Sequence, residues 1–276
     1  MLTSDQVAQF QSHGYVCFEE LFSLKQMDLL KQAANRIVDN FDPASSQSIF
    51  STKNADTNRD DYFLTSGDKV RCFFEEEAFN DDGALGQDKH LSINKIGHAL
   101  HQHVMEFIAF SQRQEISSIA KNVGVIEPEI RQSMYIFKQP KIGGEIRWHQ
   151  DATYFFTQPQ SVITFWLAVE DANLTNGCLQ VHKHGANFPL KEQFTRYPDD
   201  STELVSLSDI SWPADDAAKA LEVSAGSLVV FNGVLPHFSE ANRSNKSRHA
   251  FTLHVTSARS EYAPENWLQA APLPIS

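Results

Sequence analysis

The sequence has few cysteines and no long apolar segment. Its three cysteines, Cys17, Cys72 and Cys178, are odd in number and far apart, so neither a disulfide framework nor a thiolate metal site is expected. No apolar run approaches the length of a membrane span, and the N-terminus has no basic region followed by an apolar one. These absences predict a cytoplasmic protein that does not bind a membrane.

Positive charge is also scarce. The chain has 23 Lys and Arg against 35 Asp and Glu, which gives a net charge of −12 at pH 7. An acidic surface repels phosphate backbones, so nucleic acid is not an expected partner, and no feature indicates a protein partner. The composition is 41% hydrophobic, with 20 Phe in 276 residues. It is sufficient for a large core and suits a β-rich interior or an apolar ligand pocket.

The first 110 residues are predicted to form helices and loops. The evidence is apolar residues at helical spacing, capping residues such as Ser23 before them, and Gly14 at the end of the first helix. The expected elements are helices at 4–13, 24–40 and 93–108, strands at 15–21 and 70–74, and an irregular polar segment at 44–69.

The helix expected at 93–108 carries His98, His101 and His103. Positions three apart share a helix face, so a metal site is conceivable there. However, no carboxylate or cysteine stands at ligand spacing from them. We therefore expect solvated histidines rather than metal ligands.

From Ile130 onward, short strands are separated by turns, without helices between them. This pattern is typical of a β-sandwich or barrel. We expect one domain over residues 1–276, with a helical layer and loops at 1–110 and a catalytic β-core at 130–258. The expected strands are 132–138, 146–153, 162–169, 178–181, 226–231 and 248–256, with an irregular lid or substrate loop at 183–216.

The most informative stretch is Arg147–Asp151, which contains His149 and Asp151 two residues apart. In an extended segment alternate side chains share a face, so the imidazole and the carboxylate would point the same way. They could supply two of the three ligands of a 2-His-1-carboxylate Fe(II) site. Such a pair also arises by chance in a chain with 11 His. A third ligand is therefore needed, and His237, just past an apolar strand, is the candidate.

Arg248 is the candidate anchor for a cosubstrate. The midpoint between His237 and Arg248 lies inside Asn242–Asn245, which has turn chemistry, so we expect a hairpin that brings the two side chains together. A guanidinium near the metal could grip a carboxylate of a dicarboxylic cosubstrate bidentately. Alone, Arg248 would be a surface residue and His237 a packed strand end; the combination with His149 and Asp151 is far more specific.

These residues carry a resemblance to the phytanoyl-CoA dioxygenase family of Fe(II)/2-oxoglutarate oxygenases. The matching stretches span nearly the whole chain and include Asn94–Leu100, Gln132–Pro140, His149–Ala152 and Pro264–Leu268. The resemblance implies a β-rich α+β protein, with a double-stranded β-helix (jelly roll, cupin-like) core and N-terminal helices packed on it. It also implies that iron is bound by His149, Asp151 and His237.

The resemblance further implies that Arg248 and Ser239 hold the distal carboxylate of 2-oxoglutarate. Met134 and Trp166 fall on positions that line the cosubstrate pocket in the family, although from the residues alone either fits a core equally well. The family also uses a lysine, which matches Lys89 best and leaves Lys95 open. Fe(II), 2-oxoglutarate and O₂ are thus the expected cofactor and cosubstrates, with ascorbate as a stimulant.

The expected activity is hydroxylation of a small organic substrate with release of succinate and CO₂. A carboxylate at Asp151 favours hydroxylation, because Ala or Gly there would free a position for halide. Tyr154–Phe156 suggest an aromatic mouth, although the two Phe could equally be core. Where the family has a Pro-Gly-Ser-His turn, this chain has His182 and His184, either substrate contacts or exposed residues of a variant turn. The alternative function is a non-catalytic jelly-roll protein that binds or senses 2-oxoglutarate.

Overall fold

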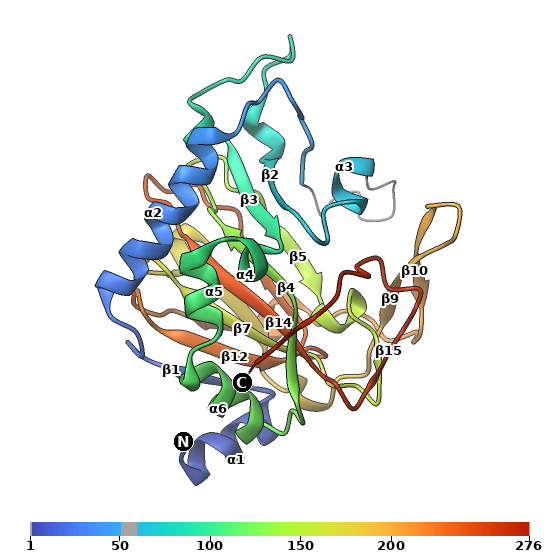
Figure 1. The fold of residues 1–276 in the computed structure, drawn as a ribbon. Coiled ribbons are helices and arrows are strands. Elements are labelled where there is room, and N and C mark those ends of the chain that lie inside the picture. The colour runs from blue at the N-terminus through green and yellow to red at the C-terminus, as the bar shows by residue number, and fades with distance from the viewer. Residues whose placement is uncertain (1, 51–59, 276) are drawn as a thin grey trace.

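The computed structural model describes residues 2–50 and 60–275, and its largest element is a curved antiparallel sheet (Figure 1). Eight described strands form this main sheet in the order β1-β12-β7-β14-β4-β3-β2, with β16 also paired to β4. Their bounds are β1 Tyr15–Phe18, β2 Val70–Phe74, β3 Ile93–His98, β4 Pro128–Ile136, β7 Ile163–Ala168, β12 Leu228–Asn232, β14 Ala250–Ser257 and β16 Leu273–Pro274.

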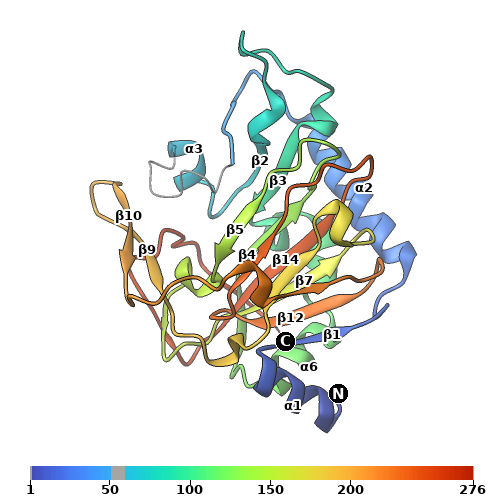
Figure 2. The ribbon, with the colours of Figure 1, turned by 180° about the vertical axis from the view of Figure 1, so that it is seen from behind.

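A smaller sheet faces the main one, and its strand β5 is seen in front of the main sheet in Figure 2. The two sheets form the predicted jelly roll, although they are not joined into a closed barrel. The smaller sheet has the order β11-β8-β13-β5, with bounds β5 Ile146–His149, β8 Leu179–His182, β11 Ala218–Leu221 and β13 His237–Ser239. Two-stranded ribbons are formed by β6 Thr157–Gln158 with β15 Glu261–Tyr262, and by β9 Glu192–Arg196 with β10 Thr202–Ser206.

Helices cover the outer face of the main sheet (Figure 1). The two N-terminal helices have the predicted bounds because their ends are set locally: Gln26 Oε1 accepts from the Ser23 N–H at 2.8 Å, and Gly14 ends the first helix at φ +80°. No helix of the described residues is both long and apolar enough to cross a membrane. The α-helices are α1 Ser4–His13, α2 Leu24–Asn40, α3 Asp61–Leu64, α4 Leu100–His103, α5 Met105–Ser111 and α6 Gln114–Asn122.

Strand alternation gives the main sheet two different faces. On β14, Phe251 and Leu253 belong to the core under the helices, and the Phe251 ring lies 4.8 Å from that of Phe107 on α5. Thr252 and His254 point the other way and line cavities between the sheets. The outer face therefore stabilises the fold, whereas the inner face is available for chemistry.

Four sequence predictions need correction. Ile93–His98 is a strand rather than the start of a helix, because it lies between β2 and β4 and is buried throughout, so its apolar spacing does not report a helix face. The first 110 residues therefore contribute β3 to the sheet, in addition to the expected strands β1 and β2 and the helices. The expected loop at 183–216 contains the β9–β10 hairpin. In the segment 44–69, α3 is helical and residues 51–59 lie outside the described part.

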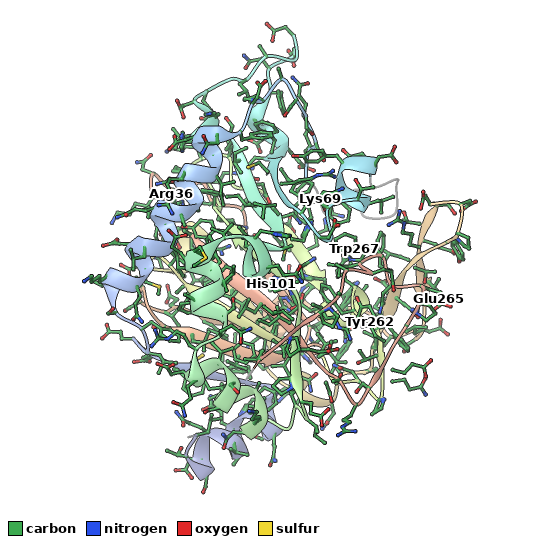
Figure 3. All side chains as sticks on the ribbon, viewed as in Figure 1. Arg36, Lys69, His101, Tyr262, Glu265 and Trp267 are labelled. Carbon is green, nitrogen blue, oxygen red and sulfur yellow. The ribbon has the colours of Figure 1, made fainter. Side chains whose placement is uncertain are left out.

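The histidines expected to be solvated are mostly buried. His98 and His101 are buried, and only His103 is exposed. His101, labelled near the centre of Figure 3, has Nδ1 2.8 Å from Ser133 Oγ, while its Nε2 is buried without a hydrogen-bond partner among the described residues. Burial lowers the pKa of His101 from 6.5 to about 4, with a smaller contribution from His103.

Acid is therefore expected to destabilise the fold through His101. Below pH 6.5 His101 of the unfolded chain binds a proton, whereas His101 of the native protein stays neutral down to about pH 4. Stability should thus fall as the pH drops through this window, by up to about 3 kcal/mol. Denaturant unfolding between pH 7 and pH 4 measures the slope, which His101→Asn should reduce strongly and His103→Asn, its exposed neighbour, only slightly. Equal slopes in the His101 variant and the parent would contradict this assignment.

Candidate metal centre and cosubstrate pocket

Three predicted ligands meet between the sheets. His149 ends β5 and His237 begins β13, and these residues are partners in the ladder between the two strands. Asp151 follows an extended Gln150 and begins a 3₁₀ turn. Nε2 of each histidine lies 3.7 Å from Asp151 Oδ1, and one ligand atom from each residue lies within 4.8 Å of the others. The arrangement fits a 2-His-1-carboxylate site, although the strand ends before Asp151 rather than running through it as predicted.

Backbone carbonyls fix the tautomers of both histidines. His149 Nδ1 lies 2.8 Å from the Arg147 carbonyl, and His237 Nδ1 lies 3.0 Å from the Leu235 carbonyl. A carbonyl can only accept, so each Nδ1 must carry a proton and donate it. The neutral tautomer that this contact selects carries its lone pair on Nε2, the atom that lies near Asp151 and that a metal ligand requires.

Two residues of the main sheet orient the Asp151 carboxylate. Thr164 Oγ1, on β7, donates to Oδ2 at 2.5 Å, and Nε2 of His254, on β14, lies 3.5 Å from the same oxygen. Thr164 and His254 are partners in the ladder between β7 and β14, so the main sheet presents them side by side. Because they occupy Oδ2, Oδ1 is the oxygen that faces His149 and His237.

The site holds its ligands in the protonation states that a metal requires. Burial favours the neutral form of Asp151, but His237, His254 and His149 outweigh burial and hold its pKa well below the ordinary value. Burial, together with His237, lowers the pKa of His149 to about 4. At neutral pH the carboxylate is therefore ionised and His149 is neutral, so neither has to release a proton to bind a cation.

A cavity of about 120 Å³ between the sheets begins at the three ligands. It contains the residues expected at the cosubstrate pocket, apart from Lys89. Its lining includes the three ligands together with Lys95, Met134, Trp166, Ser239 and Arg248. Met134 and Trp166 thus line the pocket, and Trp166 also belongs to a core cluster.

The surroundings of Arg248 indicate which kind of ligand this cavity would hold. Its side chain is only 3% exposed, and its Nε and Nη1 have no hydrogen-bond partner among the described residues. Its guanidinium lies 5.3 Å from the ring centre of Trp166, and burial lowers its pKa to about 10, which still leaves it charged at neutral pH. Buried guanidinium nitrogens without hydrogen-bond acceptors are costly, so an anion with a planar carboxylate is the complement that they need. A cosubstrate with a distal carboxylate fits.

The lysine assignment needs correction. Lys89 Nζ donates to the carbonyls of Asp39 and Phe41 at 2.8 and 3.1 Å, which satisfies the end of α2, and Lys89 lines neither cavity beside the ligands. Lys95, which the sequence left open, is buried and lines both, with Nζ 3.7 Å from Met134 Sδ. It lies on β3, whose identity as a strand the sequence did not predict.

The predicted hairpin from His237 to Arg248 is also wrong. β13 pairs with β5 and β8 in the smaller sheet, whereas β14 pairs with β4 and β7 in the main sheet. The chain therefore crosses from one sheet to the other between them. His237 and Arg248 still line the same cavity, because they approach it from opposite sides.

A second cavity, of about 140 Å³, adjoins the ligands. Phe63 and Trp267 stack in its wall with ring centres 4.6 Å apart, and Phe155 stacks on His254 at 4.8 Å. Tyr154 also lines it, so the aromatic mouth is present, whereas Phe156 does not take part. Its acidic and basic lining residues include Lys95, Arg147, Asp151 and Glu192, a mixture of both signs.

His254 and Thr164 were missed in the sequence. A signal for His254 was available, because it stands six positions after Arg248 and so has the parity of the inward-facing residues of β14. His182 and His184 lie with their rings 6.2 Å apart and line neither cavity beside the ligands.

A double-sheet fold with two imidazoles, one carboxylate and a buried arginine between its sheets defines a class: the oxygenases that depend on Fe(II) and 2-oxoglutarate. The chain belongs to the phytanoyl-CoA dioxygenase family, whose sequence profile matches residues 10–250. It is accordingly an oxidoreductase that uses Fe(II), 2-oxoglutarate and O₂ on a small-molecule substrate.

Curated relatives match over nearly the full length. Phytanoyl-CoA dioxygenase of Arabidopsis thaliana is 42% identical, covering 99% of this chain and 95% of the relative. Phytanoyl-CoA dioxygenase domain-containing protein 1 of Mus musculus is 38% identical, covering 98% of this chain and 96% of the relative.

Solved structures share the fold at low identity. The non-heme alpha ketoglutarate dependent carbocyclase SnoK from nogalamycin biosynthesis superposes with a TM-score of 0.67 at 19% identity, covering 100% of this chain and 94% of that one. EctD from S. alaskensis, solved with 2-oxoglutarate and 5-hydroxyectoine, gives 0.66 at 16% identity and covers 100% and 87%.

Proposed function

We propose that this protein hydroxylates a small, neutral or apolar organic molecule in a single catalytic domain, releasing succinate and CO₂. The observation that carries the proposal is one cavity lined both by the His149–Asp151–His237 ligand set and by Arg248, whose Nε and Nη1 have no hydrogen-bond partner among the described residues. Iron, with 2-oxoglutarate and O₂, would supply the oxidising chemistry.

In this proposal the chain contributes binding, orientation and exclusion of water. His149, Asp151 and His237 would hold iron, and their carbonyl, Thr164 and His254 contacts keep the ligand atoms in place beforehand. Arg248 and Ser239 would hold the distal carboxylate of 2-oxoglutarate, with Lys95, Met134 and Trp166 along its length. The buried pocket strengthens each of these electrostatic contacts.

The second cavity supports the choice of substrate. Stacked aromatic rings and mixed charges suit an apolar body with at most a few polar groups. A phosphate-rich carrier would need several basic residues at the mouth, and among the described lining residues Arg147 and Lys95 are accompanied by Glu192. We therefore do not propose a CoA ester. We also propose a cytoplasmic location, for which the three unpaired cysteines are the support.

Succinate formation tests the proposal. Purified protein supplied with Fe(II), ascorbate and 2-oxoglutarate is expected to release succinate, faster with a turned-over substrate, and a chelator should stop it. A non-catalytic binder would instead show thermal stabilisation by 2-oxoglutarate without succinate. Absence of both responses in iron-loaded protein would refute the proposal.

A further inference from the structure

Lys138 is a buried lysine behind the proposed cosubstrate anchor. It follows β4, is 2% exposed, and lines neither of the two cavities beside the ligands. Its Nζ donates to the Gly144 carbonyl at 2.7 Å and to Ser239 Oγ at 2.9 Å, and lies 3.5 Å from the Ser239 carbonyl. Burying an ammonium is costly unless its protons are used, and here the three acceptors match its three donors.

The position of Lys138 is also restricted sterically. Gly177 passes directly over the lysine stem with φ +79°, and a Cβ on that glycine would lie 2.7 Å from Lys138 Cε and 2.6 Å from the Glu240 carbonyl oxygen. Only a residue without a side chain allows this approach. The stem is therefore enclosed, and the ammonium has little freedom to leave Ser239.

The contact with Lys138 determines what the Ser239 hydroxyl can do. An ammonium has donors and no lone pair, so Ser239 Oγ must be the acceptor in this bond. The hydroxyl proton cannot point back at Lys138, and no described residue accepts it. Ser239 lines the same cavity as Arg248, so the free O–H donor is available to a carboxylate held there.

The charges around Lys138 are balanced. Burial and Arg248 lower the pKa of Lys138 below its ordinary value, while Glu75, Glu240 and Glu145 oppose this by favouring the ammonium form. Glu75 is itself fixed, because its Oε2 accepts from Asn94 Nδ2 at 2.8 Å and from the Gly144 N–H at 3.1 Å. A carboxylate arriving between Arg248 and Ser239 would add negative charge near two cations that otherwise repel each other.

We propose that Lys138 is a positioning residue for 2-oxoglutarate: by donating to Ser239 Oγ, it directs the serine hydroxyl to donate to the distal carboxylate that Arg248 binds. The inference rests on the proposed function, since it assumes that 2-oxoglutarate occupies this cavity. Lys138 acts through Ser239 and does not contact the iron ligands.

The test is a double-mutant cycle on 2-oxoglutarate binding to the iron-loaded protein without O₂, with kcat and KM for succinate release measured separately. Lys138→Met keeps the stem and removes the donors. It is expected to weaken 2-oxoglutarate about tenfold, the scale of a hydrogen bond to a charged group, while iron affinity and kcat at saturation stay close to the parent. Ser239→Ala should have a similar effect, and the double variant should be no weaker than the poorer single variant.

A second variant covers failure of Lys138→Met to fold. Lys138→Gln retains N–H donors, so it should lose less affinity than Lys138→Met, and it supports the same cycle with Ser239→Ala. A control ligand is 2-oxopentanoate, which lacks the distal carboxylate; its affinity should not change in any of these variants.

Several results would overturn the proposal. Additive losses in the double variant would mean that Lys138 acts independently of Ser239. Loss of iron as well as 2-oxoglutarate, or equal weakening of 2-oxopentanoate, would mean a merely structural role. Unchanged 2-oxoglutarate affinity in both Lys138 variants would remove the role altogether. If the parent protein does not bind 2-oxoglutarate at all, the proposed function fails instead, so the two failures are distinguishable.

Discussion

Asp151→Ala is expected to abolish iron binding, and succinate formation with it. The carboxylate is the one anionic ligand of the proposed set, and its Oδ1 lies 3.7 Å from Nε2 of both His149 and His237. Residues that only orient a ligand typically contribute about 10–100-fold to metal affinity, and removal of the ligand itself should exceed this range. Iron content after anaerobic loading and desalting measures the effect, with succinate release as the second readout.

The Asp151 variant needs a folding control, because the truncation also removes the carboxylate that two neighbouring side chains contact. Thr164 and His254 would lose their buried partner, so some loss of stability is expected alongside the loss of iron. The matched control is Asp39→Ala, which removes a carboxylate from an exposed pair with His90 at 2.9 Å. That variant should keep its iron. Stoichiometric iron in folded Asp151→Ala protein would show that the metal is bound elsewhere.

Arg248→Ala is expected to leave iron in place and to weaken 2-oxoglutarate by about 100-fold or more, close to 3 kcal/mol. The guanidinium is buried with two nitrogens unpartnered, so its contacts are made to the ligand rather than to the protein. Arg248→Lys should recover part of the affinity, because it restores the charge but not the planar fork. Titration of 2-oxoglutarate into the iron-loaded parent, Arg248→Ala and Arg248→Lys proteins measures the three affinities.

Arg243→Ala is the matched control for Arg248. It removes an exposed arginine from the same inter-sheet connection, where Arg243 pairs with Glu77 at 2.8 Å. Exposed ion pairs of this kind contribute little, so 2-oxoglutarate affinity should be unaffected. Unchanged affinity in Arg248→Ala as well would show that another group anchors the cosubstrate.

Local signals in the sequence were sufficient wherever the structure is determined locally. The caps of α1 and α2 lie within three or four residues of the helix ends, so both helices could be bounded. The ligand set could be proposed because His149 and Asp151 are two residues apart, and the structure brings His237 to them. Long-range pairing was not available in this way.

Two errors have the same physical origin. Turn chemistry at Asn242 predicts that the chain reverses, but it does not say which sheet the next strand joins, so the hairpin to Arg248 was wrong. Likewise, the spacing of Ile93 and Ile96 suits a helix, and only hydrogen-bonded pairing with β2 on one edge and β4 on the other makes the segment β3. Taking β3 for a helix also obscured Lys95, which lies on that strand.

The connection that carries the chain from β13 to β14 is held in place by hydrogen bonds. Asn242 anchors its middle: the side-chain Nδ2 donates to the carbonyls of Lys138 and Lys246 at 2.9 and 2.7 Å, and its backbone pairs with Gly143. Ser239 ends β13 in the smaller sheet and Arg248 precedes β14 in the main sheet, so the separation of the two sheets sets how far the guanidinium lies from the iron ligands. Under the proposed function, that separation would select the number of carbons between the two acid groups of the cosubstrate.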